Sequence, residues 1–228
     1  MFYIDPLYII LSAPALILAI SAQLLVKYFF SKYSKTMNKK EMTGVDVAEK
    51  FAREYGLNLR LNVAFADLSD HYNPAVRELT LSERVARTPS IASVGITAHE
   101  IGHALQHKKG EFLVGLRTAM VPVVNFGTTV AYILFILGLS LQFFSLAIIA
   151  VALFSLSTIF TLVTLPIEID ASIKAMRMIR AQNILYPDEL GGVKKVLIAA
   201  SLTYVAGVLQ SLSSLIYFVL RALGSRRE

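Results

Sequence analysis

The chain has 228 residues, of which 55% are hydrophobic and only 17% are charged, with a formal net charge of +6 and a mean hydropathy of +0.60. Soluble globular domains carry about 25% charged residues, so this composition excludes an ordinary soluble domain and indicates contact with membrane lipid. The absence of cysteine excludes disulfides, thiolate metal ligands and a cysteine nucleophile. The basic residues cluster in loops beside apolar runs, as in cytoplasmic loops of membrane proteins, so we expect no nucleic-acid partner.

Four apolar runs are each long enough for a helix to cross about 30 Å of hydrocarbon, which needs roughly 20 residues. They cover about 3–26, 118–138, 141–165 and 196–220. The first run lacks both a basic start and a small-residue cleavage site, so we expect a retained anchor and not a signal peptide. Only a short turn near Gly138 separates the second run from the third, which predicts a helical hairpin. The fold class is therefore predicted to be a mainly α membrane protein with about four transmembrane helices.

The distribution of positive charge predicts the orientation of these helices. Five lysines follow the first run closely, and no Lys or Arg precedes it. By the positive-inside rule, the N-terminus is outside, and segments 27–117 and 167–195 are cytoplasmic. A fourth complete crossing would place Arg221, Arg226 and Arg227 outside. Either the rule is overruled there, or the last helix does not fully cross.

The first cytoplasmic segment has the pattern of a small α+β unit. Thr43, followed three residues later by Asp46, resembles a capping box at the start of a helix, and Gly56 is a plausible stop. Apolar and more polar residues then alternate over 57–65, which predicts a strand. Residues 67–74 combine Asp, Ser, Asn and Pro and predict a turn.

A second short strand is expected at 76–82, followed by a helix at about 91–108. Ser90 is a good N-cap for that helix, and Gly110 is expected to end it. We therefore predict five segments along the chain. They are an N-terminal anchor (1–30), a cytoplasmic unit (31–117), a transmembrane hairpin (118–166), a second cytoplasmic segment (167–195), and a last transmembrane helix with a tail (196–228).

The helix expected at 91–108 carries the motif His99-Glu100-Ile101-Gly102-His103. Residues i and i+4 share one helix face, so both imidazoles can reach one metal ion. Zinc accepts neutral histidine nitrogens, and catalytic sites keep one position open for water. Glu100 lies beside that face and can take a proton from the activated water, and Gly102 keeps the space beside the second ligand small. A separate apolar face is available for packing and consists of Val94, Ala98, Ile101 and Leu105.

A third protein ligand is needed, and Glu168 is the candidate. His107 lies ~12 Å from His99 along a straight helix, which is too far for both to bind one zinc ion. Glu168 follows Pro166 at the cytoplasmic end of the third apolar run, where an acid would otherwise be costly. The alternative reading of Glu168 is a solvated acid at the membrane interface.

Several motifs together resemble those of the YugP-like neutral zinc metallopeptidases of bacteria, which in turn resemble the HtpX-type membrane proteases. The resemblance covers nearly the whole chain and is far more specific than the two histidines alone. The motifs are His99-Glu-Ile-Gly-His-Ala-Leu-Gln-His107, Asp70-His-Tyr-Asn-Pro74, Leu79-Thr-Leu-Ser82 and Pro166-Ile-Glu-Ile-Asp-Ala-Ser172.

The resemblance implies a gluzincin-like protease unit on the cytoplasmic face of the bacterial inner membrane. It implies one zinc ion per chain held by His99, His103 and Glu168, with Glu100 as the general base. It also implies protein or peptide substrates, and the nearby bilayer favours membrane or membrane-associated proteins. HtpX-like enzymes have a supporting Asp four residues after the third ligand, where this chain has Ser172 and carries its acid at Asp170.

Two further hypotheses concern substrate binding. Gluzincin-like proteases often bind substrate as an added strand, and the edge of the sheet could be formed by Leu79, Thr80, Leu81 and Ser82. His71 could polarise the substrate carbonyl or stabilise the oxyanion, although a turn histidine bonded to nearby backbone is the simpler interpretation.

Two other functions remain open. One is a site-2-protease-like intramembrane enzyme with Asp188 as the third ligand, although the helix at 91–108 is too short and too polar to span a membrane. The other is a non-catalytic zinc-bearing scaffold or regulatory subunit. A structural zinc site usually has four protein ligands, and Glu100 would then have no function.

Overall fold

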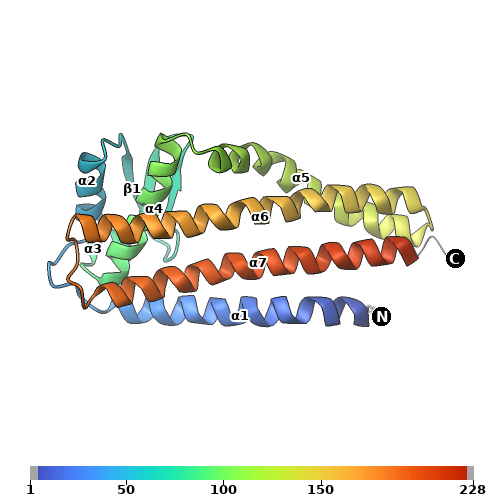
Figure 1. Cartoon of the computed structure of the whole chain (residues 1–228), viewed down its shortest axis with the longest axis horizontal. Helices are drawn as coiled ribbons and strands as arrows, with labels where there is room; N and C mark the ends of the chain where they lie inside the picture. The colour runs from blue at the N-terminus through green and yellow to red at the C-terminus, as the bar shows by residue number, and fades with distance from the viewer. Residues whose placement is uncertain (1–4, 225–228) are drawn as a thin grey trace. The chain divides into compact units, whose positions relative to one another are not determined.

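A computed structural model describes residues 5–224, and within them the chain is mainly helical (Figure 1). Four helices are long and apolar enough to cross a membrane, as the sequence predicted. They are α1 (Pro6–Ser34), α5 (Phe112–Ser140), α6 (Phe144–Ala181) and α7 (Leu190–Gly224). The start of the first predicted run at Tyr3, and Arg226 and Arg227 of the predicted tail, lie outside the described residues.

Three shorter helices and a small sheet complete the described chain. The helices are α2 (Gly44–Glu54), α3 (Glu83–Arg87) and α4 (Ile91–Lys108). The strands are β1 (Arg60–Ala64), β2 (His71–Asn73) and β3 (Glu78–Ser82). β3 is the central strand and pairs parallel with β1 and antiparallel with β2. The capping box at Thr43 and Asp46 is confirmed, and Gly56 has the positive φ that ends α2.

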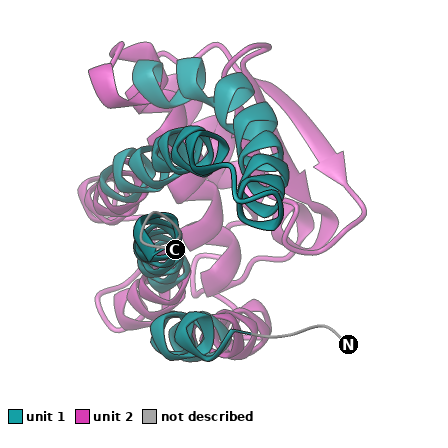
Figure 2. Ribbon diagram, turned by 90° about the vertical axis from the view of Figure 1, so that its right-hand side faces the viewer, with its two compact units in different colours: residues 1–21, 115–166, 202–228 teal, residues 22–114, 167–201 magenta. Residues whose placement is uncertain are grey.

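The described chain divides into two compact units, each built from separate stretches of sequence (Figure 2). One unit contains Met1–Ser21, Gly115–Pro166 and Leu202–Glu228, and the other contains Ala22–Val114 and Ile167–Ser201. All four long helices contribute residues to both units, α5 with only its first three residues in the second. We call the first the span unit and the second the motif unit, because the second contains the whole His99–His103 segment.

The span unit is held together by aromatic and small residues on its helices. The Phe218 ring of α7 stacks on Phe135 of α5 at a centroid distance of 4.2 Å and meets Phe154 of α6 edge-on at 4.8 Å. Buried alanines between the rings allow close approach of the backbones. At one end of this unit, Asp5 accepts hydrogen bonds from the Tyr217 hydroxyl at 2.9 Å and from Arg221 Nε at 2.5 Å.

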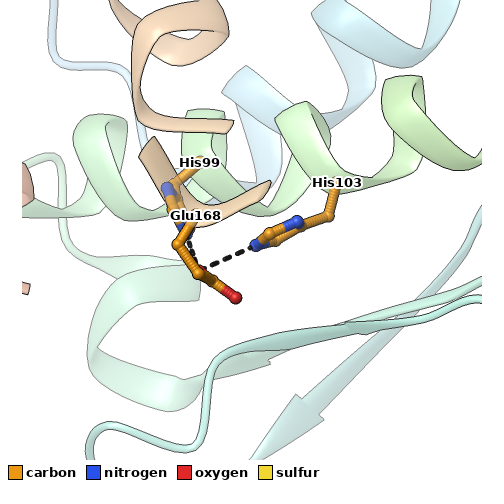
Figure 3. A group of neighbouring side chains, drawn as sticks. All are labelled: His99, His103 and Glu168. Carbon is orange, nitrogen blue, oxygen red and sulfur yellow. Dashed lines mark ion pairs between the residues drawn. The ribbon is translucent and has the colours of Figure 1, made fainter. Parts of the chain in front are cut away.

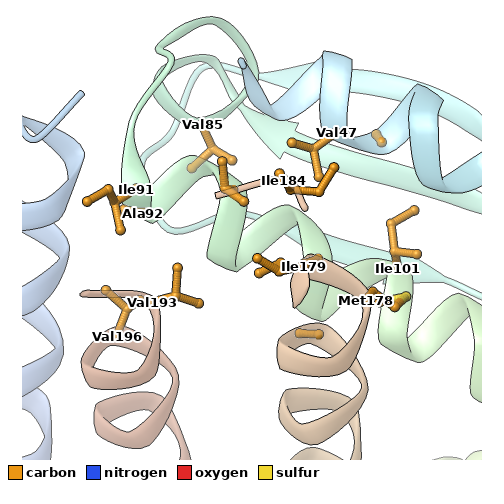
Figure 4. Close-up of a cluster of buried hydrophobic side chains, with 14 of the residues drawn as sticks. Val47, Val85, Ile91, Ala92, Ile101, Met178, Ile179, Ile184, Val193 and Val196 are labelled. Atoms are coloured by element: carbon orange, nitrogen blue, oxygen red, sulfur yellow. The ribbon is translucent and has the colours of Figure 1, made fainter. Parts of the chain in front are cut away.

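The motif unit has one hydrophobic core, which surrounds α4 (Figure 4). The predicted apolar face of α4 is confirmed: Val94, Ala98 and Ile101 are fully buried, and Leu105 is 8% exposed. Side chains from α2, α3, α6 and α7 pack on this core, for example Val47, Val85, Ile179 and Val193. Burying α4 in this way fixes the direction in which its remaining face, with the two motif histidines, points.

Two expectations from the sequence are corrected. Residues 67–74 do not form only a turn, because His71–Asn73 pair with β3 as strand β2. The predicted substrate strand Leu79–Ser82 is part of β3, which is buried and paired on both sides, so it cannot be an open edge. Helix α6 continues past Pro166 to Ala181, so Glu168 lies within this helix.

Candidate metal centre

Helix α4 has the predicted bounds and holds the two motif histidines one turn apart. Its N-cap is Ser90, whose hydroxyl accepts a hydrogen bond from the Ser93 N–H at 3.1 Å, and the buried Ser90 side chain anchors the start of the helix. The rings of His99 and His103 are nearly perpendicular, with centroids 4.8 Å apart. Both rings therefore face the same side of α4.

Glu168 of α6 meets both histidines (Figure 3). Its Oε2 atom lies 3.3 Å from Nε2 of His99 and 3.3 Å from Nε2 of His103. The Glu168 side chain is 3% exposed, whereas the histidines are 14% and 16% exposed. The candidate ligand atoms of the three residues all lie within 4.8 Å of one another. The structure thus brings together the three residues that the sequence singled out as ligands.

The distances from the Glu168 oxygen to the two histidine nitrogens fit a small tetrahedral cation. Zinc bonds of about 2.0–2.1 Å at tetrahedral angles separate neighbouring ligand atoms by about 3.3–3.4 Å. Both nitrogen-to-oxygen distances are 3.3 Å. Two imidazole nitrogens and one carboxylate oxygen are also the donor types that catalytic zinc sites use. The residues present therefore fit a zinc ion and leave a fourth position for water or substrate.

Gln106 fixes the orientation of the His103 ring, and the sequence analysis did not identify this role. Its Nε2 donates to the Ile167 carbonyl at 2.9 Å and to Asp170 Oδ2 at 2.8 Å. The amide oxygen of Gln106 must then be the acceptor in its 2.9 Å contact with His103 Nδ1. His103 Nδ1 therefore carries a proton, and in the neutral ring the lone pair of Nε2 then points toward Glu168. Two acceptors facing each other in this way favour a cation between them.

On the other histidine, Ser172 takes the corresponding place. Its hydroxyl lies 3.2 Å from His99 Nδ1. Asp170 has no hydrogen bond to either histidine among the described residues, and instead contacts Gln106 and Lys174. Lys174 also bridges to Glu111 at 3.0 Å. The two residues proposed from the sequence as outer supports therefore lie near the site by different routes, Ser172 directly and Asp170 through Gln106.

Gly102 allows α4 and α6 to approach each other at the site. A Cβ atom at this position would lie 2.8 Å from the carbonyl oxygen of Ala171, which is shorter than real side chains tolerate. Ala171 is three residues after Glu168 and directly precedes Ser172. The absence of a side chain at Gly102 thus sets how near the third candidate ligand comes to the histidines.

Glu100 is 9% exposed and contacts strand β2. Its Oε2 accepts a hydrogen bond from the backbone N–H of Tyr72 at 3.0 Å. Burial raises the pKa of the Glu100 carboxyl above its ordinary value, although the nearby His99 and His103 rings oppose that rise. A raised pKa in a carboxyl group suits a residue that accepts a proton and passes it on.

Side-chain contacts hold strand β2 and the residue before it against β3 and α4. Asp70 accepts hydrogen bonds from the Ser82 N–H at 2.7 Å and from the Ser82 hydroxyl at 3.1 Å, which joins two of the family-like motifs. The Tyr72 hydroxyl lies 2.9 Å from His107 Nδ1. His71 is exposed, and its Nδ1 lies 2.8 Å from the Ser69 carbonyl oxygen, so its catalytic role stays a prediction.

Asp188, the third ligand in the alternative protease reading, lies elsewhere in the motif unit. It is exposed and forms an ion pair with Lys39 at 2.7 Å. The sequence analysis also missed Tyr72 as the contact of Glu100. Gln106 had a detectable signal, because it is three residues after His103 on the same helix. The Tyr72 contact had no sequence signal, because the backbone N–H of Tyr72, and not its side chain, donates the hydrogen bond to Glu100.

Comparison with known proteins shows the family of the chain. The sequence model of a family described as "Putative neutral zinc metallopeptidase" matches residues 8–223. The chain is 40% identical over 223 residues to the "Putative membrane protease YugP" of Bacillus subtilis (strain 168), which covers 97% of this chain and 99% of that protein. No solved structure matches the chain.

Proposed function

Because the chain belongs to the neutral zinc metallopeptidase family that matches nearly its whole length, we propose that it is a membrane-embedded zinc endopeptidase. In this proposal one zinc ion per chain is bound by His99, His103 and Glu168, and Glu100 is the general base. The observation that carries it is the pair of 3.3 Å distances from the histidine nitrogens to one oxygen of Glu168.

The chain's own residues then have distinct tasks. Zinc, when bound, would polarise a water molecule and the peptide carbonyl. Glu100 would take the proton of that water at its carboxylate and hand it to the leaving amine. His103 is held by Gln106 in the tautomer that leaves Nε2 free to bind metal. Burial of Glu168 excludes competing water from the third ligand.

The substrate would lie along β2, which replaces β3 in the strand-addition hypothesis. β2 is an edge strand, and the N–H of Tyr72 points at Glu100 and not at β3. A peptide added on that side would compete with Glu100 for the Tyr72 N–H. We expect the substrates to be membrane or membrane-associated proteins, because four helices of the chain are suited to the bilayer.

The decisive experiment replaces Glu100 with Gln in the full-length, detergent-purified protein. Glu100→Gln should keep bound zinc but lower casein cleavage and self-cleavage by about 10²–10⁴-fold, because the amide cannot accept the proton. Glu49→Gln, an exposed glutamate on α2, is the matched control and should cleave normally. Full cleavage by Glu100→Gln would refute Glu100 as the general base, whereas zinc binding without cleavage by the unchanged protein would favour the scaffold reading.

We also propose that all four long helices cross the bacterial inner membrane, with segments 27–117 and 167–195 in the cytoplasm. Four complete crossings place the positive charge of Arg221 outside, against the positive-inside rule. The bond from Arg221 to Asp5 supports this arrangement, because it neutralises the charge and puts the end of α7 beside the start of α1. In this view the five predicted segments remain the natural division of the chain by membrane topology.

The orientation can be tested by labelling, because the chain has no cysteine of its own. Ser140→Cys lies at the end of α5 and Lys109→Cys at the end of α4. A membrane-impermeant maleimide applied to intact cells should label Ser140→Cys only, and should label Lys109→Cys after the membrane is opened. The reverse pattern would place the metal centre on the outer face and contradict the proposal.

A further inference from the structure

A groove of about 460 Å³ lies between α6 and α7 within the motif unit, apart from the candidate metal ligands. Its floor is apolar and includes the exposed side chains of Ile169, Ile173 and Ile198, which are 40%, 42% and 49% exposed. Isolated exposed isoleucines are ordinary, but three that line one hollow form a surface that water does not favour.

Three cationic side chains line the same groove: Arg177 and Arg180 from α6, and Lys194 from α7. All three are exposed, and no acidic residue lines the groove among the described residues. The ion pairs nearby join Lys174 to Asp170 and Glu111, and within residues 5–224 they involve none of the three groove cations. The groove therefore presents net positive charge beside an apolar floor, and the Asp170 carboxylate that attracts Arg177 lies outside its lining.

The charged and apolar parts are arranged in order along the two helices. On α6 the apolar Ile169 and Ile173 precede Arg177 and Arg180, and the apolar run of the helix comes before them. On α7 the order is reversed, because Lys194 comes before Ile198 and the apolar run follows. The cations thus mark the end of the groove that is remote from the apolar runs, and the isoleucines mark the end that continues into them.

We propose that this groove is a binding site for one anionic phospholipid, with the phosphate headgroup at Arg177, Arg180 and Lys194 and an acyl chain on the isoleucine floor. A lipid has this same order of parts, an anionic head followed by an apolar tail, and basic pockets between membrane helices recognise such headgroups. An acidic soluble peptide would match the cations but not the apolar floor.

The proposed lipid site shares one residue with the metal centre. Ser172 lines the groove, and its hydroxyl lies 3.2 Å from His99 Nδ1. A lipid in the groove would therefore lie against the residue that contacts one of the candidate ligands. We expect anionic lipid to raise peptidase activity by holding α6 in place, and this part of the inference rests on the proposed function.

Binding is measured by native mass spectrometry of the full-length protein in detergent with dioleoylphosphatidylglycerol, dioleoylphosphatidylcholine or inorganic phosphate. The double variant Arg177→Gln/Lys194→Gln should bind the phosphatidylglycerol about thirtyfold more weakly than the unchanged protein. The double variant Arg53→Gln/Lys195→Gln is the matched control, because it loses the same charge from exposed positions that do not line the groove. It should bind the lipid as the unchanged protein does, and phosphatidylcholine should bind weakly to all three.

Four results would overturn the lipid site. The first two are an equal loss of phosphatidylglycerol affinity in both double variants, and equal affinity for phosphatidylglycerol and phosphatidylcholine. The third is inorganic phosphate binding as tightly as phosphatidylglycerol. The fourth is a deca-glutamate peptide binding at the same cations more tightly than the lipid. Activity is then compared in nanodiscs of the two lipids. Lipid binding without cleavage in either lipid would refute the proposed function and leave the site intact, whereas cleavage independent of the lipid would refute only the coupling.

Discussion

Replacing Gln106 with Leu tests whether the amide of Gln106 prepares His103 for metal binding. Leu has a similar volume, so the buried position stays filled, but three hydrogen bonds of 2.8–2.9 Å disappear. The Nδ1–H of His103 then has no acceptor in this pocket, which costs about 1–3 kcal/mol when the group stays buried. The ring can avoid that cost only by turning or by moving its proton to Nε2, and either change removes the lone pair that faces Glu168.

The expected loss in zinc affinity follows from that cost. A penalty of about 1–3 kcal/mol corresponds to about 5- to 150-fold weaker binding, and substitutions of groups that support metal ligands typically cost 10–100-fold. The affinity is measured by competition with a chromogenic zinc chelator on the purified full-length protein. Asp170→Asn should lose less, because its amide oxygen can still accept the Gln106 hydrogen bond.

Thr97→Val is the matched control, since Thr97 lies on the same helix and is fully buried. Its hydroxyl has no hydrogen-bond partner among the described residues, so Val removes a hydroxyl without breaking a bond. This variant should bind zinc as the unchanged protein does. If Gln106→Leu kept full zinc affinity with unaltered helix content, or lost no more than Thr97→Val, the reasoning about the His103 tautomer would be wrong.

Three further predictions concern the same centre. Gly102→Ala should lower the free energy of unfolding by about 1–3 kcal/mol and weaken zinc binding, because the added Cβ forces α4 away from Ala171. Thermal unfolding measures the first effect, and chelator competition measures the second. Ser172→Ala should weaken zinc binding about tenfold by removing the hydroxyl beside His99, and Ser172→Asp should at least restore it; equal affinities of the three proteins would contradict this role. Removing zinc with a chelator should lower the melting temperature of the protein. Free zinc at about 1,000 times its Kd should restore about 4 kcal/mol of stability. A melting temperature unaffected by zinc would argue against zinc binding to the folded state.

The sequence predicted best those features that depend on local spacing. The bounds of α4 followed from Ser90 and the periodic apolar face, and the capping box at Thr43 followed from one side chain three residues ahead. The pairing of His99 with His103 needs only the helical repeat. These features are set by residues within a turn or two of each other, so a single sequence contains all the information that they require.

Features that depend on distant partners were predicted less well. Asp70-His-Tyr-Asn-Pro74 has turn-forming residues, yet part of it is strand β2, because β3 offers a pairing edge and Glu100 accepts the Tyr72 N–H. The alternation over 57–65 predicted a strand, but the strand that forms, β1, is shorter and is exposed along nearly its whole length. Tertiary pairing outweighs local propensity in strands this short.

The carboxylate near the candidate ligands lies at a different position from the one that the resemblance to HtpX-like enzymes implies. The resemblance to HtpX-like enzymes leads one to expect an acid at position 172, and a serine there gives His99 only a neutral partner. An acid is present instead at Asp170, where a helix directs it away from Glu168 and toward Gln106. The amide of Gln106 spans the gap and transmits the polarisation by the carboxylate to His103. Among the described residues, the Asp170 carboxylate therefore reaches His103 only through the amide of Gln106, and the partner of His99 is the Ser172 hydroxyl.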